Sequence, residues 1–130
     1  MGKQKMNIKY IELKTGYSDN GPAWIGNVKE SKSGKTIYFN DHAFQKHHGN
    51  FSNYIDIETS DEYWISGVKK NGQDRHWAGS GKITIDRKVI DEYLAIVQAD
   101  KLDESQFTVT DIEDVFPIDR INAKENTNTI

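Results

Sequence analysis

The 130-residue chain has no cysteine, only two prolines and no long apolar run. Without cysteine it can form neither a disulfide framework nor a cysteine-ligated metal site. The same absence fits a reducing compartment, and the basic start of the chain lacks the apolar stretch of a secretory signal, so we expect a cytoplasmic protein. No apolar stretch approaches the roughly 20 residues of a membrane-spanning helix, so we expect no membrane contact.

The formal net charge of −3 is unevenly distributed along the chain. Residues 1–50 hold eight lysines and four acids, whereas residues 51–130 hold nine basic and sixteen acidic residues. Net acidity disfavours sequence-independent binding to nucleic acid, which depends on neutralising phosphates, although the basic N-terminal half leaves it open. The acids of residues 100–130 predict a partly ordered acidic extension, which keeps the chain soluble or docks on a basic partner or on the basic half of the chain itself.

The first 85 residues alternate between apolar or β-branched segments and turn residues, which is typical of short strands. Asn71-Gly72 is the strongest hairpin signal, and residues 73–78 would pair back after it. In the segment 54–59 we expect Ile55 and Ile57 to form the apolar face. Asp41 is expected to cap a single helical turn. The predicted strands cover residues 8–15, 23–30, 36–40, 54–59, 63–70 and 82–85.

After residue 85 the apolar period becomes helical. Asp86 is a suitable N-cap, and one apolar stripe follows it, made of Val89, Ile90, Tyr93, Leu94 and Val97. These features predict an amphipathic helix over about 87–99. Residues 107–110 could form a strand, and the polar residues 122–130 are expected to fray.

The pattern as a whole predicts a mainly β chain of the α+β class. We expect a small antiparallel β-barrel or bent sheet, SH3-like or OB-like, with one C-terminal amphipathic helix. An α+β roll is the alternative. Residues 1–6 would form a flexible N-terminus, residues 7–99 the folded domain and residues 100–130 the acidic extension.

The densest group of chemically active side chains lies in residues 73–81. On a strand, Asp74 and His76 would share one face, while Arg75 and Trp77 would share the other. An Asp–His pair could perform acid–base chemistry, as in a small hydrolase, and the same side chains could equally form a binding surface or an ordinary solvated hairpin. Gly79-x-Gly81 is too short for a phosphate-binding loop.

The other histidines are weak metal candidates. Adjacent His47 and His48 cannot easily face one ion, and the spacing from His42 to His47 differs from the i, i+4 spacing of a helical pair. We therefore expect surface histidines and no metal or other cofactor.

The loop around residues 16–26 is a candidate for ligand contact. Its turn residues would present Tyr17 and Asp19, and Trp24 follows directly. Aromatic rings beside basic residues are used by single-strand nucleic-acid platforms, and equally by protein-binding faces.

Three segments resemble a family of small uncharacterised bacterial proteins: Lys14–Gly26 (KTGYSDNGPAWIG), Ser33–Asn40 (SGKTIYFN) and Lys69–Trp77 (KKNGQDRHW). The resemblance covers roughly Ile8 to Leu94 and implies a bacterial origin but no activity. Some members carry the label 1-deoxy-D-xylulose-5-phosphate synthase. That enzyme is several times longer and binds thiamine diphosphate and Mg²⁺, and this chain has no diphosphate-binding motif.

These features favour a non-enzymatic binding module for a protein or a small ligand. The expected contact residues are Tyr17, Asp19, Trp24, Arg75, His76 and Trp77. The alternatives are a small hydrolase that uses Asp74 and His76, and a barrel that binds single-stranded nucleic acid.

Overall fold

The computed structural model describes residues 6–14, 21–72, 74 and 81–128. Within these ranges nine strands form one sheet in the order β3-β4-β5-β6-β7-β1-β2-β8-β9. The strands are β1 (Ile8–Leu13), β2 (Ala23–Asn27), β3 (Lys29–Glu30), β4 (Thr36–Phe39), β5 (His42–Lys46), β6 (Tyr54–Asp56), β7 (Glu62–Gly67), β8 (Ile83–Asp86) and β9 (Phe107–Thr110). The helices are a short 3₁₀ turn, η1 (Arg87–Val89), then α1 (Ile90–Val97) and α2 (Ile118–Asn128). None of these helices is long and apolar enough to cross a membrane.

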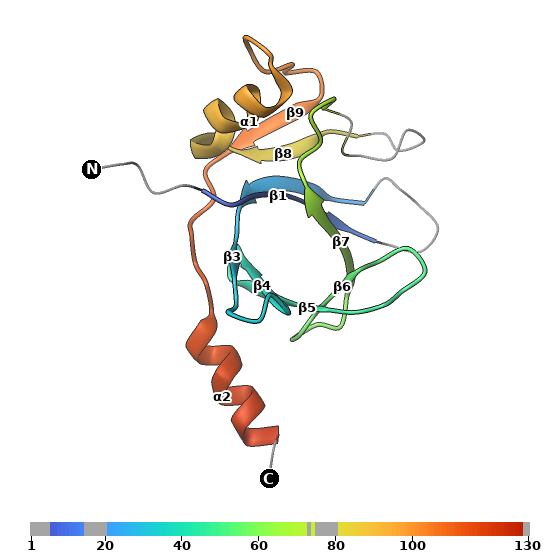
Figure 1. The fold of residues 1–130 in the computed structure, drawn as a ribbon, viewed down its shortest axis with the longest axis vertical. Coiled ribbons are helices and arrows are strands. Elements are labelled where there is room, and N and C mark those ends of the chain that lie inside the picture. Colours follow the sequence, from blue (N-terminus) through green and yellow to red (C-terminus); the bar gives the residue numbers. More distant parts are fainter. Residues whose placement is uncertain (1–5, 15–20, 73, 75–80, 129–130) are drawn as a thin grey trace, which may run out of the picture.

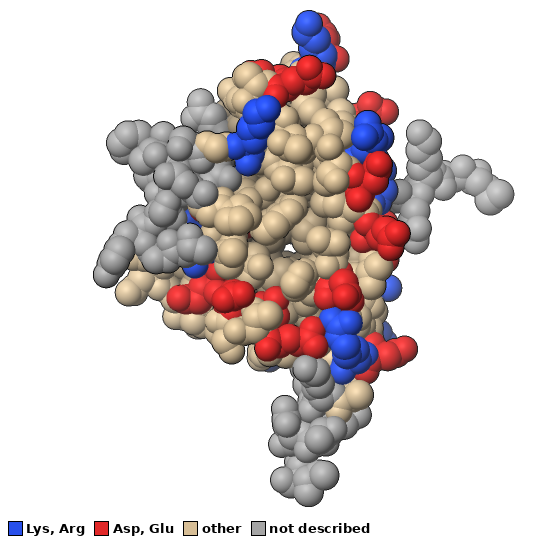
Figure 2. All heavy atoms as spheres, turned by 180° about the vertical axis from the view of Figure 1, so that it is seen from behind, with Lys and Arg blue, Asp and Glu red and all other residues tan. Residues whose placement is uncertain are grey.

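The run of strands from β3 to β2 curls around a common interior (Figure 1). These two strands stand at opposite ends of that run, yet Val28 alone separates them along the chain. Every pairing within the run is antiparallel. The prediction of a mainly β chain with a bent sheet is therefore confirmed. Figure 2 shows the molecule from the opposite side, with acidic and basic side chains lying around the edge of this face.

The pairing of the last two strands differs from the antiparallel expectation. β8 pairs in parallel with β2, and β9 pairs in parallel with β8. Parallel neighbours need a crossover connection, which η1 and α1 supply between β8 and β9. Both strands were predicted as segments, but their direction depends on where the helix returns the chain to the sheet.

β1 has an apolar face on each side because it separates two cores. Ile11 belongs to the interior of the curl, whereas Tyr10 belongs to a second core outside it. The interior core consists of Ile11, Val28, Ile37, Phe39, Phe44, Tyr54, Tyr63 and Ile65. Gly26 is required there, since a Cβ atom at this position would lie 2.4 Å from Cε1 of Phe39.

The second core lies between β1, β2, β8, β9 and the helix α1, which covers this part of the sheet (Figure 1). Tyr93 of α1 packs edge-on against Phe107 of β9, with ring centroids 5.4 Å apart. Gln98 ends the helix in the left-handed conformation, at a φ of 57°. Phe107 is buried in this core although it falls in the range expected to be an acidic extension.

The helix α2 was not predicted, since residues 122–130 were expected to fray. Ile121 is fully buried and packs with Tyr38 and Ala43 on the outer side of β4 and β5. Ile118 lies one turn earlier in the helix and supports the same contact. Two isoleucines at i, i+3 spacing are a weak signal for a helix in the sequence. The apolar outer side of β4 and β5, on which they pack, exists only in the folded sheet.

The prediction of a helical turn after Asp41 was wrong. Asn40 and Asp41 have φ values of 49° and 65°, so they form the two-residue turn between β4 and β5. Such tight hairpins need positive φ at both turn residues, and Asn and Asp tolerate it better than most side chains. Ala43 and Phe44 are therefore strand residues.

Candidate functional site

A small pocket lies on the interior side of the curled sheet, where residues of β1, β2, β4, β5 and β7 meet. Its volume is about 30 Å³, which is room for only a few atoms. Ile11, Phe39, Phe44 and Tyr63 are the buried residues of its lining, while Asn40 and His42 are exposed at its rim. The lining residues are Ile11, Trp24, Phe39, Asn40, His42, Phe44 and Tyr63, and none of them carries a permanent charge.

Strand alternation places His42 over this pocket. His42 and Phe44 are two residues apart on β5 and share a face, and their rings stack with centroids 6.0 Å apart. Asp56 of β6 pairs with Phe44 across the sheet and shares the same face. Nδ1 of His42 lies 3.0 Å from Oδ2 of Asp56, whose side chain is almost completely buried.

The partner of Nδ1 decides what His42 offers to a ligand. A carboxylate accepts hydrogen bonds, so Nδ1 carries the proton and, in the neutral ring, Nε2 keeps a free lone pair. Within the described part of the chain, Nε2 has no hydrogen-bond partner. His42 therefore presents an oriented acceptor at the rim of an apolar pocket.

Asp56 is held by its own turn. Its Oδ1 accepts hydrogen bonds from the backbone N–H groups of Glu58, at 2.8 Å, and Thr59, at 3.2 Å. The sequence pattern placed Asp56 on the polar face of the strand, and this was wrong, because Tyr54 and Asp56 are buried while Ile55 is half-buried. The signal that could have found it is an aspartate immediately before a polar turn, where the carboxylate can bond the backbone two residues on.

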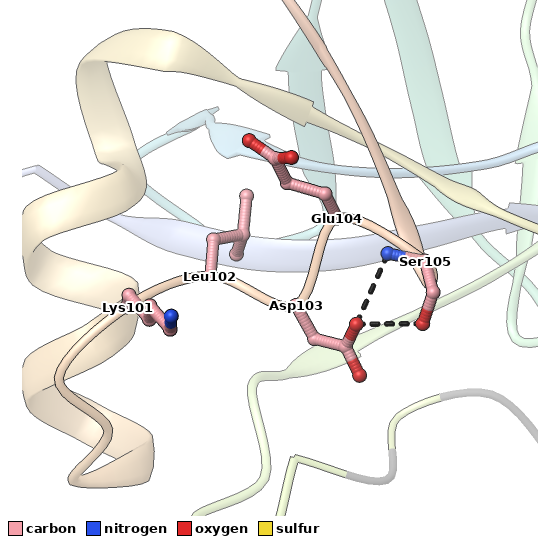
Figure 3. Close-up of a pocket in the computed structure, with 5 residues that line it drawn as sticks. All are labelled: Lys101, Leu102, Asp103, Glu104 and Ser105. Atoms are coloured by element: carbon pink, nitrogen blue, oxygen red, sulfur yellow. Dashed lines mark hydrogen bonds between the residues drawn. The ribbon is translucent and has the colours of Figure 1, made fainter.

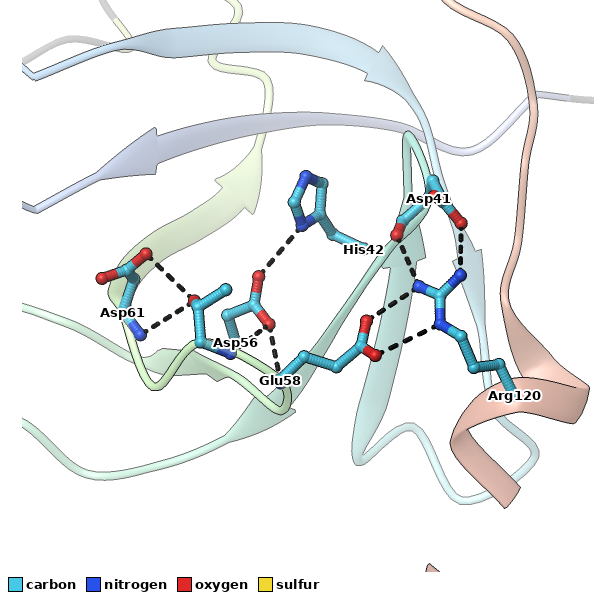
Figure 4. A network of polar contacts seen from close by, with 7 residues as sticks. Asp41, His42, Asp56, Glu58, Asp61 and Arg120 are labelled. Atoms are coloured by element: carbon cyan, nitrogen blue, oxygen red, sulfur yellow. Dashed lines mark hydrogen bonds and ion pairs between the residues drawn. The ribbon is translucent and has the colours of Figure 1, made fainter. Parts of the chain in front are cut away.

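Arg120 of α2 ties together the two turns that flank this pair (Figure 4). Its guanidinium donates to Oδ1 and to the carbonyl oxygen of Asp41, at 2.8 and 2.9 Å. It also donates to both carboxylate oxygens of Glu58, at 2.8 and 3.2 Å. The hydrogen bonds to Asp41 and Glu58 raise the pKa of Arg120. Asp41 precedes His42 and Glu58 follows Asp56 closely, so α2 positions both halves of the pair.

Tyr63 completes one wall of the pocket as a neutral hydroxyl. Burial, followed by the nearby carboxylates of Asp56 and Asp61, raises the pKa of Tyr63 to about 12. Its ring lies 4.6 Å from that of Phe44, centroid to centroid, and is tilted by 58°. The two rings therefore present differently oriented surfaces to the pocket.

The structure does not bring the three predicted metal candidates together. His47 lies in a loop, where its Nε2 is 3.2 Å from Oγ of Ser52 and 3.3 Å from Oε1 of Glu62. Ser52 itself donates to Glu62 at 2.8 Å, so these three residues brace the loop and do not form a relay through both ring nitrogens. His48 is exposed. Among the residues described, no group of three or more potential ligands could hold a metal ion.

Asp74, one half of the predicted acid–base pair, is buried. Its Oδ1 accepts a 2.7 Å hydrogen bond from the backbone N–H of Lys69, and burial raises its pKa. Burial and the charge of Asp74 raise the pKa of Tyr93 to about 12. The remaining predicted residues, Tyr17, Asp19, Arg75, His76 and Trp77, lie outside the described residues. The pairing of Asp74 with His76 stays a prediction.

An open surface depression lies between α1 and β9, along residues 101–105 (Figure 3). The carboxylate of Asp103 accepts hydrogen bonds from Oγ of Ser105, at 2.6 Å, and from its backbone N–H, at 3.0 Å. These two bonds lower the pKa of Asp103. Asp103 and Ser105 therefore stabilise the turn itself. The pocket at Trp24 and His42 is the stronger candidate.

Comparison of the chain with protein-family models, curated proteins and solved structures gives no match. Trp24 was predicted as a contact residue and His42 as a weak metal candidate, and the structure brings these two side chains to one pocket. Asp56 and Arg120 complete the arrangement and were missed by the sequence pattern.

Proposed function

We propose that this protein is a non-enzymatic binding module that receives one end of a ligand in the pocket between Trp24 and His42. The observation that carries the proposal is the combination of aromatic walls with one oriented acceptor at the rim. Binding sites commonly combine apolar walls with a few placed polar groups. At about 30 Å³ the pocket is far smaller than a metabolite site. It therefore suits the tip of a side chain or a small head group.

We further propose that the curled sheet is a small barrel of the SH3-like or OB-like type, from a bacterial protein of the family that the chain resembles. The continuity of β2 and β3 through Val28 supports the barrel, because it joins the two ends of the curled run. The family assignment rests on the three segments given above, all within residues 14–77.

A small hydrolase is the second candidate, favoured by the hydrogen bond between His42 and Asp56. The lining residues include no serine, threonine, cysteine or lysine, so the nucleophile of such a hydrolase would be a water molecule. Nε2 of His42 would act as the general base that activates it. Turnover of activated esters above background, abolished in His42→Gln and retained in His48→Gln, would favour this reading. The pocket supports binding of single-stranded nucleic acid less well than these two functions, because no lysine or arginine lines it to contact phosphate.

The binding proposal can be tested by a fragment screen that follows the tryptophan indole resonances by NMR. Fragments that enter the pocket should shift the indole signal of Trp24 and leave that of Trp64 unchanged. Trp64 is the matched control, since it is 40% exposed on β7 and does not line the pocket. Binding should be lost in Trp24→Leu and kept in Trp64→Leu. A diverse library that never shifts Trp24 would contradict the proposal.

A further inference from the structure

We infer that the pocket is selective for an alkylammonium group, the positively charged end of an amine ligand. This inference rests on the proposed binding function and adds the chemical class of the ligand. Three features of the site carry it: the aromatic walls, the excess of carboxylates in the adjoining network of His42 and Arg120, and the acceptor nitrogen of His42.

Aromatic side chains form most of the pocket wall. Trp24, Phe39, Phe44 and Tyr63 all line it, and Phe44 and Tyr63 are tilted against each other by 58°. The face of an aromatic ring carries partial negative charge and attracts cations, most strongly in tryptophan. Rings that meet at an angle can surround a compact cation from several sides, which is how aromatic cages hold methylated ammonium groups.

The charge around the pocket favours a cation. The network in Figure 4 contains four carboxylates, those of Asp41, Asp56, Glu58 and Asp61, against the one guanidinium of Arg120. The two backbone N–H groups that donate to Oδ1 of Asp56 stabilise this carboxylate but carry no net charge to cancel its own. A negative field over an apolar pocket attracts cations and repels carboxylate or phosphate ligands.

His42 supplies the directional contact. With Nδ1–H donated to Asp56, Nε2 can accept a hydrogen bond from an ammonium N–H at the rim. The volume of about 30 Å³ limits the group to a small head, with the rest of the ligand outside the pocket. An ammonium that has small alkyl substituents and keeps one N–H matches both the walls and this acceptor.

The test compares three probes of nearly identical shape on the full chain by NMR titration. These are protonated dimethylethanolamine, choline, and the uncharged analogue of choline in which carbon replaces nitrogen. We expect the two cations to shift the Trp24 indole signal. The uncharged analogue should bind at least about threefold more weakly, as expected for the loss of a cation–π contact. The dimethyl compound should bind more tightly than choline because it alone offers an N–H to His42.

The outcomes separate this inference from the proposed function. Equal or tighter binding of the uncharged analogue would overturn the inference while leaving a shape-selective binding module. Binding of other fragments at Trp24, with no binding of either cation, would do the same. If no fragment binds to the pocket, both the inference and the proposed binding function are wrong. A further arm compares free dimethyl-lysine with the same residue inside a short peptide, because tighter binding of the peptide would identify a protein side chain as the source of the ammonium group.

Two variants test whether the carboxylates contribute to the preference for a cation. Asp56→Asn removes the buried charge behind His42, so it should narrow the preference for choline over its uncharged analogue. Glu104→Gln is the matched control, because it removes one carboxylate from the depression between α1 and β9, which shares no lining residue with the pocket. An unchanged preference in a folded Asp56→Asn protein would count against the inference. If Asp56→Asn does not fold, the three-probe comparison on the natural chain still decides it.

Discussion

Replacing Asp56 by alanine should destabilise the fold strongly, because one buried carboxylate satisfies three donors. These are the backbone N–H groups of Glu58 and Thr59 and the Nδ1–H of His42. A typical hydrogen bond contributes a net of about 1 kcal/mol, and one to a charged group about 1.5–3 kcal/mol. The bond to His42 belongs at the low end, since 46% of the His42 side chain is exposed. We therefore expect Asp56→Ala to lower the free energy of unfolding by about 3–4 kcal/mol.

Asp56→Asn separates the two functions of the carboxylate. Its amide oxygen can still accept from the backbone of the turn, whereas its NH₂ group would face Nδ1–H of His42. The ring must then change tautomer or turn away, so we expect a smaller loss of about 1–2 kcal/mol. Urea unfolding followed by tryptophan fluorescence measures both variants, with similar m-values expected if the native state is otherwise unchanged.

Asp61→Ala is the matched control in the same turn. Among the described residues, the Asp61 side chain accepts one hydrogen bond, from the exposed Thr59 hydroxyl. The backbone N–H groups of Glu58 and Thr59 bond Asp56 instead. Its removal should cost within about 0.5–1 kcal/mol. A loss below about 1 kcal/mol in Asp56→Ala, or equal losses in the alanine and asparagine variants, would refute the view that Asp56 holds both the turn and His42.

Three further predictions follow from other parts of the fold. Gly26→Ala should cost about 1–3 kcal/mol in urea unfolding and weaken fragment binding, because its Cβ would collide with the buried ring of Phe39; unchanged stability would show that the ring yields freely. Ile121→Ala should cost about 2–4 kcal/mol, and a loss under about 0.5 kcal/mol would mean that α2 is not docked. The pKa of Asp74 is raised by burial, so the folded state holds this proton more tightly, and the associated stability is present at low pH and lost as pH rises through the raised pKa. Asp74→Asn should therefore compare more favourably with the natural chain at neutral pH than below about pH 4, and a pH-independent difference would contradict this.

Local patterns along the chain predicted the mainly β fold well. The two apolar faces of β1 and the helical stripe after Asp86 are visible in the sequence, because their periods differ and each is several residues long. The direction of β9 was not visible, since a four-residue strand carries no mark of its parallel pairing. The β5 strand was missed because Asn40 and Asp41 resemble a helix cap as much as a tight turn.

The candidate site was only half visible for a different reason. Trp24 and His42 stand out as residue types, but Asp56 and Arg120 act through partners 14 and 79 residues away. The alternation around Asp56 favoured the isoleucines as the buried face, and the structure reverses it. Tyr54 packs in the interior core, and Asp56 is buried with its carboxylate bonded to its own turn and to His42. Such choices depend on the assembled sheet, and a single strand does not encode them.

The order of the strands also bears on whether the sheet can extend by pairing with a second copy of the chain. The two ends of the sheet are β3, with two residues, and β9, with four. Short edge strands give a neighbouring molecule little backbone to pair with, so the sheet has little tendency to extend from one copy to the next. A chain cut after residue 99 would lose β9 and turn β8 into the edge, with Ile83 and Ile85 next to unpaired backbone. Residues 107–110 thus protect the backbone of β8 by pairing with it.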